Sequence, residues 1–99
     1  MFVIRDILYC KPGKVRPMVA KFASMKKLGE KMGLGSMRVL TDYSGERFWT
    51  VITEVEVPTI DTWTDVMNKS MQNKEFQELM KDYHDMVDHG RREIYKLEA

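Results

Sequence analysis

The amino-acid sequence predicts an α+β fold with one antiparallel sheet. Extended runs rich in β-branched and aromatic residues alternate with segments whose apolar residues recur at helical spacing, in the order strand, helix, strand, strand, helix, strand. The chain has 99 residues, of which 43% are hydrophobic. This size and composition fit a single domain spanning residues 1–99.

The segment Phe2–Cys10 is predicted to be the first strand. It is rich in β-branched and aromatic residues and ends at a Lys-Pro-Gly turn. Both of its faces carry apolar side chains, one interrupted by Arg5 and the other by Asp6. Neither face is therefore typical of a water-exposed surface, and the two charges require partners, for which Glu54, Arg92 and Glu93 are the candidates.

A helix and a hairpin follow this strand. Apolar residues recur at helical spacing over Val15–Met32, and the glycines at positions 33 and 35 end the helix. Ser36–Tyr43 and Arg47–Val57 are predicted to be paired strands, because the loop Ser44-Gly45-Glu46 suits a tight connection. In the second of these strands Trp49 lies on one face and Phe48 on the other.

The last third of the chain is predicted to be helical and then extended. Thr59 or Asp61 caps a short helix, and Asn73 caps a longer one that ends at Gly90. Residues 91–98 form the last strand. His89 would lie in the last turn of the longer helix, where a cation meets free carbonyl groups.

Strands that are apolar on both faces predict a sheet that is covered on both sides. The order of elements is that of the ferredoxin-like β-α-β-β-α-β arrangement, in which both helices lie on one face of the antiparallel sheet. The other face stays bare in a monomer, and its apolar patch would exceed what soluble monomers usually expose. We therefore expect a homodimer through the open sheet face.

Soft motifs distributed along the chain carry a family resemblance: the Lys11-Pro12-Gly13-Lys14 turn, the hairpin segment Ser44-Gly45-Glu46-Arg47-Phe48-Trp49, Trp63, and the helix start Asn73-Lys74-Glu75-Phe76. With them the chain resembles the dimeric α/β-barrel superfamily, in particular its NIPSNAP-like and antibiotic-monooxygenase-like (ABM-like) members. The resemblance implies a pocket in each subunit between helices and sheet, which in the enzymatic members holds haem or an aromatic substrate.

The haem-degrading members of this superfamily use an Asn on the first strand, a Trp before the long helix's Phe and a His after it. The corresponding helix positions hold Ser70 and Met80 here, and no Asn precedes Asn68. The sequence therefore disfavours haem degradation, and no cofactor is expected. Cofactor-free monooxygenases of the superfamily use a Trp and polar residues around an aromatic substrate, a role open to Trp63 or Trp49.

His84 is the candidate catalytic residue, because it lies beside Tyr83 at the edge of the apolar stripe of the longer helix and histidine titrates near neutrality. The alternative is a partly buried histidine bonded to a neighbour. Trp49, Trp63 and Tyr83 are candidate ligand-binding residues, although aromatic residues with apolar neighbours also serve as core. Arg5 either recognises an anionic ligand or joins an ion pair at the dimer seam.

Several classes of protein are disfavoured by the sequence. The only cysteine is Cys10, which indicates a reducing, cytoplasmic location, and no metal-ligand spacing is present. Residues 1–38 carry nine Lys/Arg and two acidic residues, whereas residues 39–89 carry four and eleven. This near-cancelling dipolar distribution gives little support for nucleic-acid binding, and no apolar run is long enough to cross a membrane.

The sequence thus predicts a small homodimeric protein that binds a small apolar ligand or serves as an assembly module. The alternative is a cofactor-independent monooxygenase acting on an aromatic compound. The two differ in the interior: an enzyme needs polar groups that converge on a ring-sized pocket, whereas a structural module fills that space with side chains.

Overall fold

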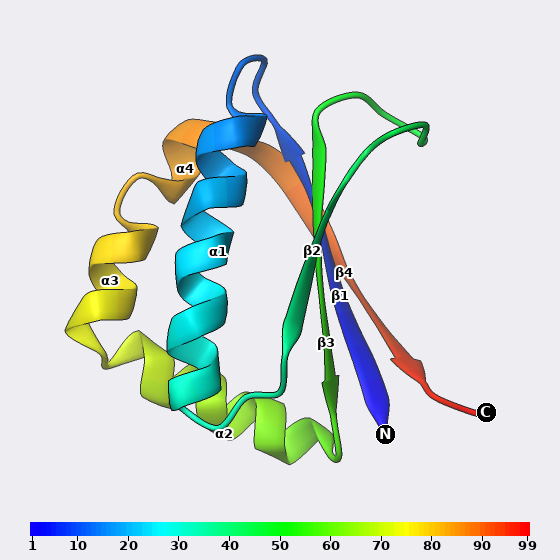
Figure 1. The fold of residues 1–99 in the computed structure, drawn as a ribbon, viewed down its shortest axis with the longest axis vertical. Helices are drawn as coiled ribbons and strands as arrows, with labels where there is room; N and C mark the ends of the chain where they lie inside the picture. Colours follow the sequence, from blue (N-terminus) through cyan, green and yellow to red (C-terminus); the bar gives the residue numbers. More distant parts are fainter.

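The computed structural model describes residues 1–99 and contains a four-stranded sheet with all helices on one face (Figure 1). The elements are β1 (Phe2–Cys10), α1 (Val15–Lys31), β2 (Met37–Thr41), β3 (Thr50–Val57), α2 (Ile60–Met71), α3 (Lys74–Met80), α4 (Tyr83–Met86) and β4 (Val87–Lys96). The strand order is β2-β3-β1-β4, and every neighbouring pair is antiparallel. This confirms the predicted ferredoxin-like arrangement.

Strand β1 occupies the middle of the sheet and pairs along its whole length with β3 and β4. Its alternating pattern assigns the two faces. Leu8 and Cys10 pack with Met18 and Phe22 of α1, so the even-numbered side chains of β1 face the helices. The odd-numbered side chains, including Arg5 and Ile7, lie on the open face.

Helix α1 follows the sequence pattern closely. Met18, Phe22 and Leu28 are its buried residues, spaced so that they lie along one side of the helix. The backbone of Gly33 has a φ of 90°, a conformation that ends helices and that favours glycine. The predicted stop is therefore confirmed.

Side-chain caps begin the two following helices. The Thr59 hydroxyl accepts a hydrogen bond from the backbone N–H of Thr62 at 3.1 Å, and the Asn73 side chain accepts one from Phe76 at 3.0 Å. Each bond satisfies an N–H that the helix cannot use itself. Of the two predicted caps for α2, Thr59 is the one that the structure uses.

The predicted long helix after Asn73 is wrong. Helix α3 ends at Met80, α4 adds a single turn, and β4 already begins at Val87. Gly90 therefore pairs with Leu8 inside the sheet and caps no helix, and His89 lies on β4 with its ring 4.9 Å from that of Tyr9. Helical spacing alone did not reveal this break, because residues near a helix end can also satisfy the alternation of a strand.

The hairpin strands are also shorter than predicted. They cover Met37–Thr41 and Thr50–Val57, so Phe48 and Trp49 lie in the connecting loop and not on a strand. In Figure 1 this loop extends away from the helices, past the open face of the sheet. Trp49 has a φ of 58°, which is unusual for a bulky residue.

Hydrogen bonds hold this loop in one conformation. The Asp42 carboxylate accepts from the backbone N–H of Thr50 at 2.9 Å, and the Thr50 hydroxyl donates to the carbonyl of Arg47 at 2.9 Å. The backbone N–H of Cys10 donates to the carbonyl of Trp49 at 2.8 Å. The loop is therefore an ordered part of the open side of the molecule.

We expect Gly90→Ala to destabilise the fold by about 1–3 kcal/mol, as overpacking does elsewhere. A Cβ at this position would lie 2.7 Å from the carbonyl oxygen of Ile7 and 2.8 Å from a methyl carbon of Leu8. Urea unfolding measures the change. Gly45→Ala is the control, because its Cβ would meet only the Asp42 Cβ at 3.8 Å; equal stability of the two variants would contradict the expectation.

Candidate functional site

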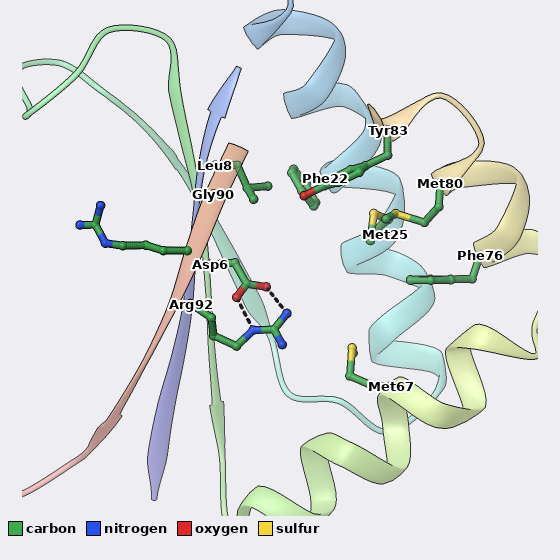
Figure 2. A pocket seen from close by; sticks show the side chains of 11 residues that line it. Asp6, Leu8, Phe22, Met25, Met67, Phe76, Met80, Tyr83, Gly90 and Arg92 are labelled. Carbon is green, nitrogen blue, oxygen red and sulfur yellow. Dashed lines mark hydrogen bonds and ion pairs between the residues drawn. The ribbon is translucent and has the colours of Figure 1, made fainter. Parts of the chain in front are cut away.

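A pocket of about 390 Å³ lies between the helices and the sheet (Figure 2). Its helix side comes from α1, α2, α3 and α4, and its sheet side comes from β1 and β4. The short helices α3 and α4, which have no buried residues of their own, contribute Phe76, Met80 and Tyr83 to its helix side. Its apolar lining consists of Leu8, Phe22, Met25, Met67, Phe76, Met80 and Tyr83.

An ion pair forms the polar part of this pocket. The guanidinium of Arg92 donates two hydrogen bonds to the Asp6 carboxylate, at 2.6 and 3.1 Å. The pair arises because Asp6 and Arg92 are register neighbours on β1 and β4, both on the helix face. The hydrogen bond to Asp6 raises the pKa of Arg92 above its usual value, and the charge of this guanidinium is balanced by the carboxylate of Asp6.

Tyr83 adds a polar atom to the mostly apolar end of the pocket. It extends from α4 across Phe22, with its hydroxyl toward the sheet (Figure 2). Burial raises the pKa of Tyr83, and the negative charge of Asp6 raises it further. The phenol is therefore protonated at neutral pH and can donate a hydrogen bond into the pocket.

His84 lies outside this pocket, on an adjoining hollow of about 320 Å³ that shares Phe76, Met80 and Tyr83 with it. The imidazole is exposed and contacts the Tyr83 ring edge-on, at 5.2 Å between centroids. The structure thus brings His84 and Tyr83 together, as predicted from their adjacency, with Tyr83 standing between His84 and the main pocket.

A cation on α1 fixes the turn that carries these two residues. The Lys21 ammonium contacts the Asp82 carboxylate at 2.5 Å and donates a hydrogen bond to the carbonyl of Leu79. The hydrogen bond from Lys21 lowers the pKa of Asp82, so the contact is a charged one at neutral pH. The α3–α4 turn is therefore tied to α1 beside the pocket.

The remaining predicted site residues lie elsewhere. Trp63 packs against the buried cluster of Ile4, Val55 and Val57 and holds the Arg92 guanidinium over its ring at 4.5 Å. Trp63 therefore orients a pocket residue without lining the pocket. Trp49 is in the β2–β3 loop, 48% exposed, and Arg5 is on the opposite face of the sheet.

Arg5 belongs to a row of charges that crosses the open face. Its Nε donates to the Glu54 carboxylate at 2.8 Å, and its guanidinium lies 3.9 Å from Glu93. Arg38 donates to the other oxygen of Glu54. Burial tends to raise the pKa of Glu54, but the hydrogen bonds from Arg38 and Arg5 outweigh it and leave this pKa below its usual value. The predicted partners of Arg5, Glu54 and Glu93, are confirmed.

The open face is thus more mixed than the strand pattern predicted. Its apolar side chains surround the charged row on both sides, and Ile7 is buried even without a partner chain, at 6% exposure. A hollow of about 360 Å³ lies between this face and the β2–β3 loop. The apolar residues of the open face are Val3, Ile7, Tyr9, Leu40, Ile52 and Tyr95.

The sequence predicts that Asp6 and Arg92 take part in ion pairs, but it does not assign either residue to the ligand pocket. The alternation of side chains along β1 is the feature of the sequence that indicates the position of Asp6. Asp6 is the one charged residue among the even-numbered side chains of β1, which otherwise face the core. The register that sets Arg92 opposite Asp6 could not be read from the sequence, because the predicted start of the last strand was displaced.

No group of three or more His, Cys, Asp or Glu side chains is arranged to hold a metal ion. None of the helices combines the length and the apolar character that a membrane span requires.

The fold and the pocket together define a ferredoxin-like α+β protein with an apolar pocket under its helices. No protein-family model matches the chain, and no curated protein matches its sequence. Solved structures of the same fold include proteins of the two groups that the sequence motifs resemble.

An uncharacterized NIPSNAP domain protein from Burkholderia xenovorans superposes with a TM-score of 0.82 at 15% identity, covering 100% of this chain and 96% of that one. A NIPSNAP family protein from Agrobacterium tumefaciens gives 0.84 at 13% identity, with 98% and 92% covered. An antibiotic biosynthesis monooxygenase gives 0.72 at 10% identity, with 100% of both chains covered. At this identity the likeness establishes the fold, and the predicted resemblance is confirmed at that level.

The buried Glu54 predicts a pH dependence of stability. Its pKa in the folded protein lies below the ordinary 4.5, so its contribution is present above pH 4.5 and is lost as the pH falls through the folded-state value. We expect Glu54→Gln to be less stable than wild type at pH 7 and to lose less stability on acidification. Urea midpoints between pH 7 and pH 3 measure this slope. Glu56→Gln, an exposed site on the same strand, is the control, and parallel slopes for wild type and Glu54→Gln would contradict the expectation.

Proposed function

We propose that the protein is a cytoplasmic homodimer, one domain per subunit, that binds a small, largely apolar ring compound in the pocket between helices and sheet. The observation that carries this proposal is the pocket itself. It has a volume of about 390 Å³, and its apolar lining consists mainly of methionine and aromatic side chains. A concave, mostly apolar lining with a few polar groups is the usual form of a site for a small molecule. Flexible thioethers suit a pocket that adapts to a ligand.

The polar groups of the pocket narrow the class of ligand. Asp6 and Arg92 neutralise each other, and Tyr83 is a neutral donor. A ligand carboxylate would add a second negative charge near Asp6, and the two cations of the lining, Arg92 and Arg91, are already bonded to Asp6 and Glu93. A neutral carbonyl group that accepts from the Tyr83 hydroxyl satisfies the site, so an aromatic ketone is the favoured chemistry.

We expect Met80→Trp to weaken binding of the bicyclic ketone 2-tetralone at least ten-fold, because Met80 projects into the pocket beside Met25 (Figure 2) and an indole there occupies the ring site. Titration calorimetry measures the affinity. Ala23→Trp, on an exposed position of α1, introduces the same side chain away from the pocket and should bind as wild type does.

The preference for a carbonyl group is tested by comparing the binding of 2-tetralone with that of tetralin. Tetralin has the same fused rings without the oxygen, so Tyr83→Phe should reduce affinity for 2-tetralone about three- to ten-fold, the value of one hydrogen bond, and leave tetralin unaffected. If neither compound binds to the wild-type protein, the ligand proposal is wrong. Equal losses of affinity for the two compounds in Tyr83→Phe would contradict the role of the hydroxyl group.

Dimerisation through the open face is supported by the side chains that this face exposes. Leu40 is 41% exposed beside the half-buried Ile52, and the neighbouring loop presents Tyr43 and Phe48 at 104% and 80% exposure. Burying such residues against a second copy removes apolar surface from water. The chain has a single cysteine, Cys10, so it forms no intrachain disulfide, and this thiol is buried at 5% exposure. A free cysteine of this kind supports the cytoplasmic location.

A second candidate, cofactor-independent oxygenation of the same class of ketone, is favoured by His84, a base in the adjoining hollow that contacts Tyr83 of the pocket. The fold shared with an antibiotic biosynthesis monooxygenase also favours it. In this reaction an activated CH₂ loses a proton to a base and then becomes C=O. Dioxygen supplies that oxygen and accepts the electrons of the two C–H bonds, and its second atom leaves as water.

If the protein is such an oxygenase, wild type will consume O₂ with 2-tetralone faster than autoxidation, and His84→Ala will lose about 10²-fold of that rate, as expected for a general base. An oxygen electrode measures the uptake. His89→Ala, on β4, is the control and should keep the wild-type rate. Uptake at the autoxidation rate alone would exclude this activity and leave ligand binding.

A further inference from the structure

A second cavity, of about 50 Å³, adjoins the main pocket. Its walls come from α1, α2, α3 and β2, and seven of the nine residues that line it are hydrophobic, so it is an apolar space. Three of its lining residues, Met25, Met67 and Phe76, also line the main pocket. These three side chains therefore separate the main pocket from the second space, which we call the inner cavity.

The lining of the inner cavity does not favour a bound water. Ser70 is its only polar side chain, and the Ser70 hydroxyl donates to the carbonyl of Val66 at 2.8 Å. The carbonyl of Gly29 accepts from the backbone N–H of Leu34 at 2.9 Å. A buried water needs two to four polar partners, and the side chains of this lining offer no free donor. The inner cavity therefore suits an apolar group.

The side chains between the two spaces can move. Met25 and Met67 are half-buried, and a methionine side chain has three rotatable bonds and adapts to irregular gaps. Phe76 is also half-buried and comes from α3, which has no buried residues. Rotation of either methionine can therefore open the inner cavity to a group that enters from the main pocket.

The inner cavity lies at the end of the pocket away from Tyr83. Along α1, Phe22 lines only the main pocket, Met25 lines both spaces and Leu28 lines only the inner cavity. Six residues of helix separate Phe22 from Leu28, which corresponds to about 9 Å along the axis. Figure 2 shows Met67 at the opposite end of the pocket from Tyr83. A ligand carbonyl at the Tyr83 hydroxyl therefore leaves the other end of the ligand facing the inner cavity.

We propose that the ligand of this pocket is a ring ketone with a short alkyl group at the end opposite the carbonyl, and that this alkyl group occupies the inner cavity. The proposal rests on the proposed ligand binding and specifies the class of ligand. A cavity of about 150 Å³ accommodates the six carbons of benzene. The inner cavity, at about 50 Å³, therefore takes about two carbons, which corresponds to a methyl or an ethyl group.

The first test is a series of 6-alkyl-2-tetralones, because a substituent at position 6 extends along the long axis of the rings, away from the carbonyl. Titration calorimetry measures the affinity of the wild-type protein for 2-tetralone and for its 6-methyl, 6-ethyl and 6-butyl derivatives. We expect affinity to rise about three- to four-fold per carbon up to ethyl, the value of one buried methylene. The butyl derivative should bind no more tightly than the ethyl derivative.

Gly29→Ala should remove this gain, because the added methyl group takes up part of the inner cavity. Its Cβ would lie 3.5 Å from a methyl carbon of Leu34, an ordinary contact, so the fold accepts it. We expect this variant to bind 2-tetralone as wild type does and the 6-ethyl derivative at least three-fold more weakly than wild type. Gly45→Ala makes the same change in the β2–β3 loop and should keep the wild-type preference.

Val66→Ala should have the opposite effect. Val66 is a buried residue of α2 that lines the inner cavity, and its truncation lengthens the space available to an alkyl group. We expect the 6-butyl derivative to gain affinity relative to the 6-ethyl derivative in this variant. Urea unfolding checks that each variant is folded, and the two substitutions test the inner cavity independently of each other.

The outcomes distinguish this proposal from the one on which it rests. If neither 2-tetralone nor any alkyl derivative binds to the wild-type protein, the proposed ligand binding is wrong and the alkyl preference falls with it. If 2-tetralone binds and the methyl and ethyl groups add no affinity, only the role of the inner cavity is wrong. A gain for the ethyl group that both Gly29→Ala and Val66→Ala leave unchanged would place the alkyl group elsewhere and would also overturn the proposal.

Discussion

The central strand β1 carries two adjacent charges in an otherwise apolar sequence, and their satisfaction organises both faces of the sheet. Because successive side chains of a strand point to opposite faces, Asp6 enters the helix side and Arg5 the open side. Asp6 binds Arg92 from β4, and Arg5 binds Glu54 from β3. A buried or half-buried charge without such a partner would be costly, so the register of β1 with both neighbours is fixed by these pairs as well as by the core.

The same register places the two ion pairs on opposite faces of the sheet. The Asp6–Arg92 pair gives the pocket a neutral polar floor, held in orientation by the contact of Arg92 with Trp63. The Arg5–Glu54 pair, one residue away along the strand, belongs to the face that we assign to a second copy. In the proposed function, ligand and partner are recognised on opposite sides of one sheet, and neither role requires the residues of the other. A substitution at Arg5 is expected to affect association, whereas one at Asp6 affects the pocket.

Much of this architecture could be predicted from the sequence, for identifiable reasons. Phe2–Cys10 was predicted at its observed bounds because a continuous β-branched and aromatic run ends at Pro12-Gly13, and the caps Thr59 and Asn73 begin the helices that their side-chain chemistry favours. The segment after Met80 was misjudged because one turn of helix leads directly into β4. What decides the structure there is tertiary: Gly90 lies against the backbone of Ile7, a contact that only the paired strand makes.

The site was predictable only where sequence neighbours remain neighbours in space. Tyr83 and His84 stayed together, but Arg5 and Trp49, both assigned to the ligand, lie on the other side of the sheet. The order of the charged row depends on four strands whose residues are far apart in the chain, so its alternation becomes visible only when the register is known. A row that alternates in sign across an even number of strands is complementary to its own reverse. That property is what a symmetric dimer needs, and a face made of uniform apolar residues would not select one axis over another.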